Sequence, residues 1–108
     1  MTTSSGSQPL TERTLRIVER LFDADDVGGA QRMLIEECGT NLPFCETQDA
    51  AGLERIRFAV LMLSDGDLDK LRTAIDRASS DWRDVLVAAG FGYSLTAHDE
   101  WATDVLQA

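Results

Sequence analysis

The chain has 108 residues, of which 44% are hydrophobic, so it is long enough to bury one core and form one domain. Its 19 acidic and 10 basic residues give a net charge of −9, with both signs spread along the sequence. Phosphate groups are bound by concentrations of Lys and Arg, and no such concentration stands out. We therefore expect no direct binding to nucleic acid or to a membrane.

The first nine residues, MTTSSGSQP, carry no charged side chain and one apolar side chain, which offsets little of the entropy lost on ordering. We predict a flexible tail over 1–9 and a single all-helical domain over 10–108. The tail lacks the basic and apolar segments of a signal peptide, and no later run reaches transmembrane length. On these patterns we expect a soluble, cytoplasmic protein.

Apolar residues at helical spacing predict two helices in the first part of the domain. The first covers about 11–22, and Thr11 suits its N-cap position. The second covers about 26–38 and ends before Gly39, which fits the left-handed position that closes many helices. Both helices are amphipathic, so each is expected to turn one side toward a core.

The third predicted helix, about 49–64, determines the architecture. Its first half is amphipathic, with Arg57 among the charged side chains expected to face water. The next six residues, Phe58 to Leu63 (FAVLML), are all apolar and would cover every side of the helix. Such a segment must be surrounded by protein. We therefore predict an all-α fold of about six short helices packed around this third helix.

Three further helices are predicted, over about 67–78, over about 81–89, and after Thr96. Asp67 is expected to cap the first of them, and Thr96 the last. Between these helices, Ser79 and Ser80 are expected to end the fourth helix and to cap the fifth.

The end of the fifth predicted helix has a recognisable signature. Gly90 followed by Phe91 resembles a Schellman motif, in which a left-handed glycine closes the helix and the next residue makes an apolar contact. We expect this motif to end the fifth helix.

A calcium site is the best metal candidate, in the sequence SDGDLDKLRTAID. Carboxylates stand at positions 1, 3, 5 and 12 of an EF-hand-like loop, and they belong to Asp65, Asp67, Asp69 and Asp76. Position 6 is Lys70, where the sharp turn of an EF-hand requires Gly. The apolar spacing also demands a helix where the loop should curl. We therefore predict no metal site here, and no cofactor.

Thiol and carboxylate chemistry has equally weak support. Cys38, Cys45 and His98 lack the spacing and the fourth ligand of a zinc site, and a Cys–His hydrogen bond cannot be derived from the sequence. His98 falls in the first turn of the last predicted helix, where an imidazole gains nothing from the helix dipole. Acid–base pairs are conceivable among a few acids, which charged helix ends explain as well: Glu36, Glu37, Glu46 and Asp49. We predict no catalytic residue.

Candidate interaction residues are apolar side chains outside the expected core. Val87 lies opposite the buried stripe of the fifth helix, so it is either enclosed between neighbouring helices or exposed to a partner. Phe44 and Tyr93, with Leu42, either anchor their loops or line a shallow apolar groove.

The segments LIEECG, NLPF, ERIRFAVLMLSDGDLDKLRTAI and DWRDVLVAAGF together resemble an uncharacterised family of short helical bacterial proteins. The resemblance covers about residues 10–106. It implies a helical fold and a bacterial source, and it implies no activity and no catalytic residue.

The function that we predict is protein binding without catalysis, by a small acidic protein whose partner is another protein or a second copy of itself. A specific version is an inhibitor like an immunity protein or an antitoxin, which blocks a basic toxin by charge complementarity. The alternative is a small-ligand or metal-binding protein, or an enzyme, with a site near the Cys38–Asp49 loop. A helix-turn-helix around 67–89 is not expected to bind DNA, because its second helix would bring two acids to the phosphates for one base, Arg83.

Overall fold

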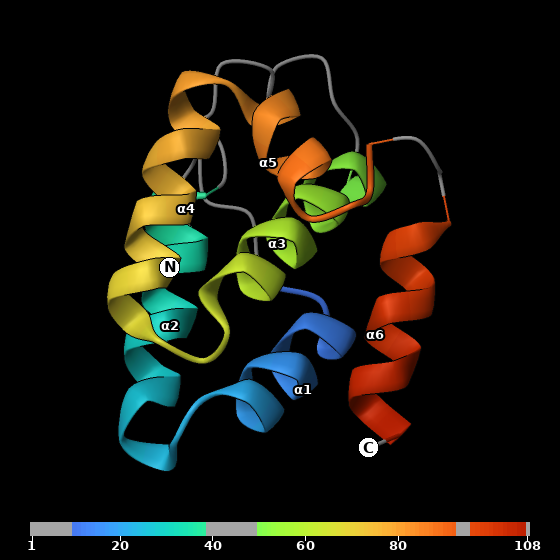
Figure 1. Cartoon of the computed structure of the whole chain (residues 1–108). Coiled ribbons are helices and arrows are strands. Elements are labelled where there is room, and N and C mark those ends of the chain that lie inside the picture. The colour runs from blue at the N-terminus through green and yellow to red at the C-terminus, as the bar shows by residue number, and fades with distance from the viewer. Residues whose placement is uncertain (1–9, 39–49, 93–95, 108) are drawn as a thin grey trace, which may run out of the picture.

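The computed structural model describes residues 10–38, 50–92 and 96–107, and these form six helices without a strand. The helices are α1 (Glu12–Leu21), α2 (Ala24–Glu37), α3 (Ala50–Ser64), α4 (Leu68–Ser80), α5 (Trp82–Ala88) and α6 (Ala97–Gln107) (Figure 1). The prediction of an all-α fold with six helices is therefore confirmed. Within the described segments, no helix has both the length and the apolar character needed to span a bilayer.

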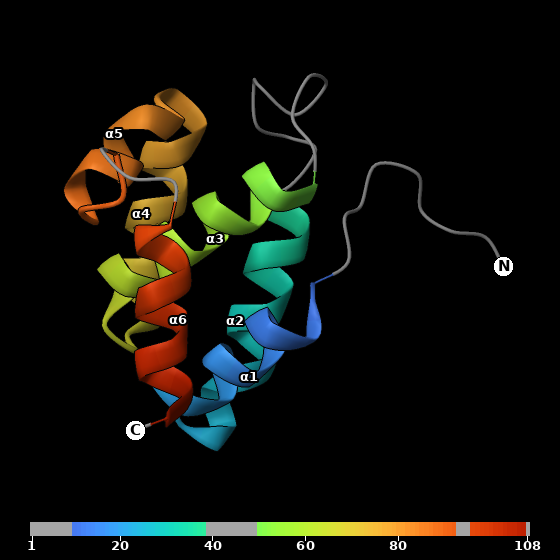
Figure 2. The ribbon, with the colours of Figure 1, turned by 90° about the vertical axis from the view of Figure 1, so that its right-hand side faces the viewer.

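Helix α3 crosses the middle of the molecule and packs against α1, α4, α5 and α6 (Figures 1 and 2). Four consecutive α3 residues, Phe58 to Leu61, have no exposed surface at all. This confirms that α3 is the central helix. The prediction that the apolar run is surrounded along its whole length is wrong at Met62, which is 40% exposed.

Arg57 departs from the prediction in the opposite direction, because it is buried among apolar side chains with 3% of its surface exposed. Its Nε donates a hydrogen bond to the Cys38 carbonyl at 2.9 Å, and its Nη2 donates to the Leu34 carbonyl at 3.3 Å. Leu34 lies in the last turn of α2 and Cys38 is its C-cap, and the carbonyls at this end of a helix lack intrahelical donors and carry partial negative charge. Arg57 therefore fastens the end of α2 to the centre of α3.

The junction between α4 and α5 also differs from the prediction. Ser79 and Ser80 remain inside α4, where the Ser79 hydroxyl donates to the Ile75 carbonyl one turn back. The cap of α5 is Asp81, whose side chain accepts a hydrogen bond from the Arg83 amide at 3.1 Å. A serine hydroxyl can bond within its own helix, so it does not oblige the helix to stop.

The turn between α3 and α4 is tight and packs against the end of α1. Asp65 and Gly66 both have positive φ, of 51° and 80°. A Cβ atom on Gly66 would lie 2.4 Å from the backbone oxygen of Leu21, so the turn requires glycine for its conformation and for space.

Replacing Arg57 by Met should lower the free energy of unfolding by about 2 kcal/mol, because the carbonyls at the end of α2 lose a charged donor. Urea denaturation followed by circular dichroism measures the change. Arg32→Met is the matched control, since Arg32 is exposed on α2, and it should stay within about 0.5 kcal/mol of the wild type. Equal losses in the two variants would contradict the proposed role of Arg57.

Two glycine-to-alanine substitutions should have opposite effects on thermal stability. Gly66→Ala should destabilise by about 2–4 kcal/mol, because it combines backbone strain with a clash against Leu21. Gly28→Ala should stabilise by about 1 kcal/mol, because Gly28 lies within α2 and a Cβ there meets no atom within 4 Å. A Gly66→Ala variant that melts no lower than the wild type would show that the turn is not packed as described.

Candidate functional site

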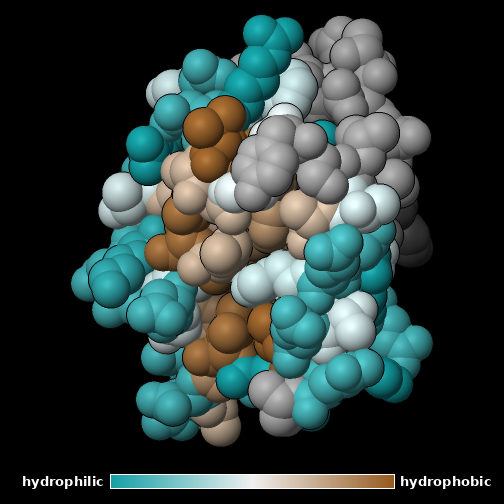
Figure 3. Space-filling model, turned by 45° about the vertical axis from the view of Figure 1, so that its right-hand side comes forward, coloured by the Kyte–Doolittle hydropathy of each residue, from teal (hydrophilic) through white to brown (hydrophobic). Residues whose placement is uncertain are grey.

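Two large apolar side chains are exposed within the described segments, Val87 at 70% and Met62 at 40%. The burial of Val87 between neighbouring helices, one of the two alternatives derived from the sequence, is therefore wrong. Figure 3 shows that apolar side chains run over one face of the molecule, from α5 downward between α6 and the end of α3. Single exposed apolar residues are ordinary on protein surfaces, whereas a continuous group marks a candidate interaction site.

The end of α5 fixes the position of Val87. The Phe91 amide donates to the Leu86 carbonyl at 2.8 Å and the Gly90 amide to the Val87 carbonyl at 3.0 Å, while Gly90 has a φ of 83°. These are the two hydrogen bonds and the left-handed residue of a Schellman motif, so the predicted motif is confirmed. The chain then turns back beside Val87, since a Cβ on Gly92 would lie 3.0 Å from Val87 Cγ2.

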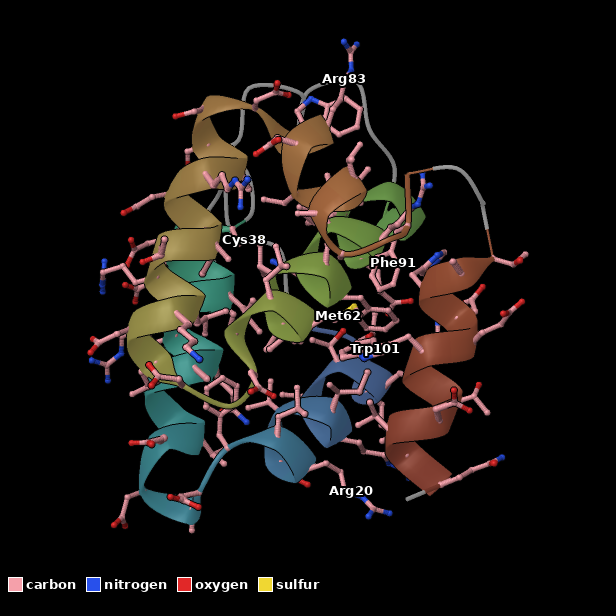
Figure 4. The ribbon with its side chains drawn as sticks, in the orientation of Figure 1. Arg20, Cys38, Met62, Arg83, Phe91 and Trp101 are labelled. Atoms are coloured by element: carbon pink, nitrogen blue, oxygen red, sulfur yellow. The ribbon has the colours of Figure 1, made fainter. Side chains whose placement is uncertain are left out.

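The same turn sends Phe91 into an aromatic cluster between α3 and α6. The Phe91 ring lies 6.1 Å from the Trp101 ring, and Phe58 of α3 lies 5.9 Å from Trp101. Met62 follows Phe58 by four residues and therefore lies on the same side of α3. Figure 4 shows Met62, Phe91 and Trp101 directed toward the space between α3 and α6. Trp101 is half-buried, so part of its side chain reaches the surface.

We call Val87, Met62 and Trp101 the apolar face. Its three side chains come from α5, α3 and α6, and the buried Phe91 ring packs beside Trp101. Arg55 of α3 donates a hydrogen bond to the Phe91 carbonyl, which holds the segment after α5 against α3. The side chains of the apolar face are thus held in place by packed helices and by the turn that follows α5.

Arg13 holds α6 beside α1 and α3. Its Nη2 pairs with Glu54 Oε2 at 2.7 Å and with Asp99 Oδ1 at 2.8 Å. The guanidinium carbon also lies 5.0 Å from the centre of the Phe58 ring. Hydrogen bonding to Glu54 raises the pKa of Arg13 above its ordinary value, so this arginine stays charged.

His98 lies in the first turn of α6, as predicted, and its side chain is buried. Its ring lies 5.9 Å from Phe58 and 6.3 Å from Phe91. Within the part of the chain that the structure describes, its Nδ1 atom has no hydrogen-bond partner. The aromatic spacing of His98 and Trp101 on one helix was the signal available in the sequence.

The pKa of His98 lies below its ordinary value of 6.5 because burial disfavours the charged imidazolium. The cations Arg55 and Arg13 lower it further, whereas the carboxylates of Asp99 and Glu54 partly offset this effect. His98 therefore binds a proton less readily in the folded chain than an exposed histidine does.

The four aspartates of the EF-hand-like pattern do not gather around a common point. Asp67 caps α4, where its Oδ1 accepts hydrogen bonds from the Asp69 and Lys70 amides at 2.8 and 3.1 Å. Asp65 lies in the preceding turn, and Asp76 lies two turns into α4. Among the described residues, no group of three or more His, Cys, Asp or Glu is placed to hold a metal ion.

Several other sequence candidates fall outside the described residues: Phe44, Tyr93, Cys45, Glu46 and Asp49. Of their described counterparts, Cys38 is fully buried, and Glu37 pairs with Arg72 of α4 at 3.1 Å. The alternative site near the Cys38–Asp49 loop therefore stays a prediction.

Two open depressions lie on the surface of the described residues. One, of about 510 Å³, is lined by Arg13 and Glu54, which already pair with each other. Another, of about 300 Å³, lies along α4 with Leu63 and Ala74 among its lining residues. Neither borders His98.

Comparisons with protein-family models, curated proteins and solved structures give no match to this chain. The resemblance to short bacterial proteins therefore stays a prediction, and the site rests on this chain's own geometry.

His98 should make the folded protein less stable in mild acid. The unfolded chain binds a proton near pH 6.5 and the folded chain only at lower pH, so stability is complete above about pH 6.5 and falls as pH decreases below it. Urea denaturation between about pH 5 and pH 7.5 measures the slope. His98→Leu should flatten that slope, and an unchanged slope in the variant would show that other groups cause it.

Proposed function

We propose that this protein works by binding another protein through the apolar face, and that its partner is basic. The observation that supports this most directly is the exposure of two large apolar side chains, Val87 at 70% and Met62 at 40%, in a molecule whose surface shows apolar side chains gathered on one side (Figure 3). Burying a Val side chain completely is worth about 1.5–3 kcal/mol, so a face of this kind can anchor a partner.

The charge of the chain supports the choice of partner. A net charge of −9 on 108 residues repels acidic proteins and attracts basic ones during encounter. The apolar face then provides the close contact that dispersed surface charge lacks. A specific form of this function is inhibition, in which the bound protein blocks a basic toxin as an immunity protein or an antitoxin does. This form is an analogy, since a helical fold does not by itself define a function.

A photo-crosslinking amino acid at position 87 tests the proposal in the cells from which the protein comes. We expect an adduct between this chain and one basic protein, since position 87 would lie at the interface. The matched control carries the same crosslinker at Glu36, which is exposed on α2 on the other side of the molecule (Figure 1). The control should not form that adduct.

Equal adducts from positions 87 and 36 would contradict the apolar face as the binding site. An adduct at position 87 with the mass of two copies of this chain would show self-association in place of a separate partner. If position 87 forms no protein adduct at all, the proposed function is wrong.

A further inference from the structure

We infer that the segment of the partner that docks on the apolar face is an amphipathic helix whose apolar stripe is flanked by Lys and Arg. The inference rests on the proposed function and specifies the partner's chemistry. It follows from the packing around α3 and from the charges that border the face.

The packing leaves one side of the central helix uncovered. Helix α3 contacts four other helices, yet Met62, in its last turn, remains 40% exposed. Figure 1 shows α5 above this side of α3 and α6 beside it. Helices usually pack by placing the ridges of side chains on one helix into the grooves of another. A helix laid over Met62, with α5 at one end and α6 alongside, would cover this side of α3 and touch all three residues of the face.

Acidic side chains border the face along α6. Asp104 follows Trp101 by three residues and therefore shares its side of the helix, and Glu100 precedes Asp104 by four. Both carboxylates are exposed, and α6 contains neither Lys nor Arg.

The turn after α3 provides the opposite border. Asp65 and Asp67 follow Met62 within five residues, and both are exposed. The face therefore has carboxylates on two sides, along α6 and at the end of α3.

Two exposed arginines, Arg83 and Arg20, are directed away from Met62. In Figure 4, Arg83 of α5 points away from Met62, and its guanidinium carbon lies 5.2 Å from the centre of the Trp82 ring. Arg20 lies near the far end of α6, where it donates to the Leu106 carbonyl at 2.8 Å. A docked helix would thus meet apolar side chains in the middle and carboxylates at its flanks. The partner's helix therefore needs apolar side chains one turn apart, with basic residues beside them.

Model peptides test this inference without a known partner. The probe is a peptide of Leu and Lys, about 18 residues or five turns long, with Leu at helical spacing. One comparison peptide replaces every Lys by Glu, and another keeps the Leu–Lys composition but has no helical periodicity. Titration of the full chain is followed by tryptophan fluorescence and by amide NMR shifts.

We expect the helical Leu–Lys peptide to bind at least about tenfold more tightly than either comparison peptide, a difference of about 1.4 kcal/mol. The amide shifts should cluster around Val87, Met62 and Trp101. Val87→Asp should weaken the binding by about tenfold or more, because it places a carboxylate under the apolar stripe. Shifts that cluster elsewhere, or equal affinity for the three peptides, would overturn the inference.

Two double variants separate local charge from total charge. Glu100→Lys with Asp104→Lys reverses the α6 border, and Glu19→Lys with Glu36→Lys changes the net charge equally at exposed sites on α1 and α2. The first pair should weaken binding of the Leu–Lys helix about tenfold, and the second should weaken it much less. Equal losses would indicate a general attraction to an acidic protein and would overturn the inference.

Failure of this inference is distinguishable from failure of the proposed function. If crosslinking at position 87 captures a partner but the Leu–Lys helix does not bind, the partner's docking segment is not a basic helix. If crosslinking captures no protein, the proposed function itself fails, whatever the peptides do.

Discussion

Burial of the apolar run in α3 is the constraint that arranges the other helices. Phe58 to Leu61 are apolar on successive sides of the helix, so no single neighbour can cover them. Helices α1, α4, α5 and α6 each take one sector of this surface. Six short helices provide enough cover for Phe58 to Leu61 but not for Met62, one residue later in the run. Met62 is thus exposed in the candidate site because the helices that cover the core do not extend over it.

Arginines join the elements that this packing brings together. Arg57 reaches from α3 to the last carbonyls of α2, Arg55 reaches from α3 to the Phe91 carbonyl, and Arg13 links α1 to carboxylates on α3 and α6. A guanidinium has five donors on a long stem, so it can satisfy acceptors on another element while its stem packs against apolar side chains. This reach explains how Arg57 can be buried in the core.

Sequence patterns predicted the helices and most of their ends, because periodicity and capping are local properties. Asp67 and the Gly90–Phe91 turn act as their positions suggested. The patterns were insufficient where the answer depends on which neighbours cover a given sector. Periodicity shows which side of α3 carries Met62 or Arg57, but it does not show whether another helix lies over that side. For the same reason the sequence left Val87 undecided and gave no sign that the rings of Phe58 and Phe91 lie beside His98.

The charged residues likewise show that the composition of the chain does not reveal how its charges are arranged in the fold. The excess of acidic residues is spread along the sequence and does not concentrate in any one segment. It therefore argues against some classes of partner but does not indicate where a partner binds. In the fold, α6 carries Asp99, Glu100 and Asp104 and contains neither Lys nor Arg. Arg13 pairs with Asp99 on the side that packs against α1 and α3, whereas Glu100 and Asp104 stay exposed. The helix that contributes Trp101 to the apolar face thus keeps its unneutralised charge at the border of that face. Apolar contact and negative charge therefore meet on one surface, and this combination, more than the total charge, restricts the partners that can bind.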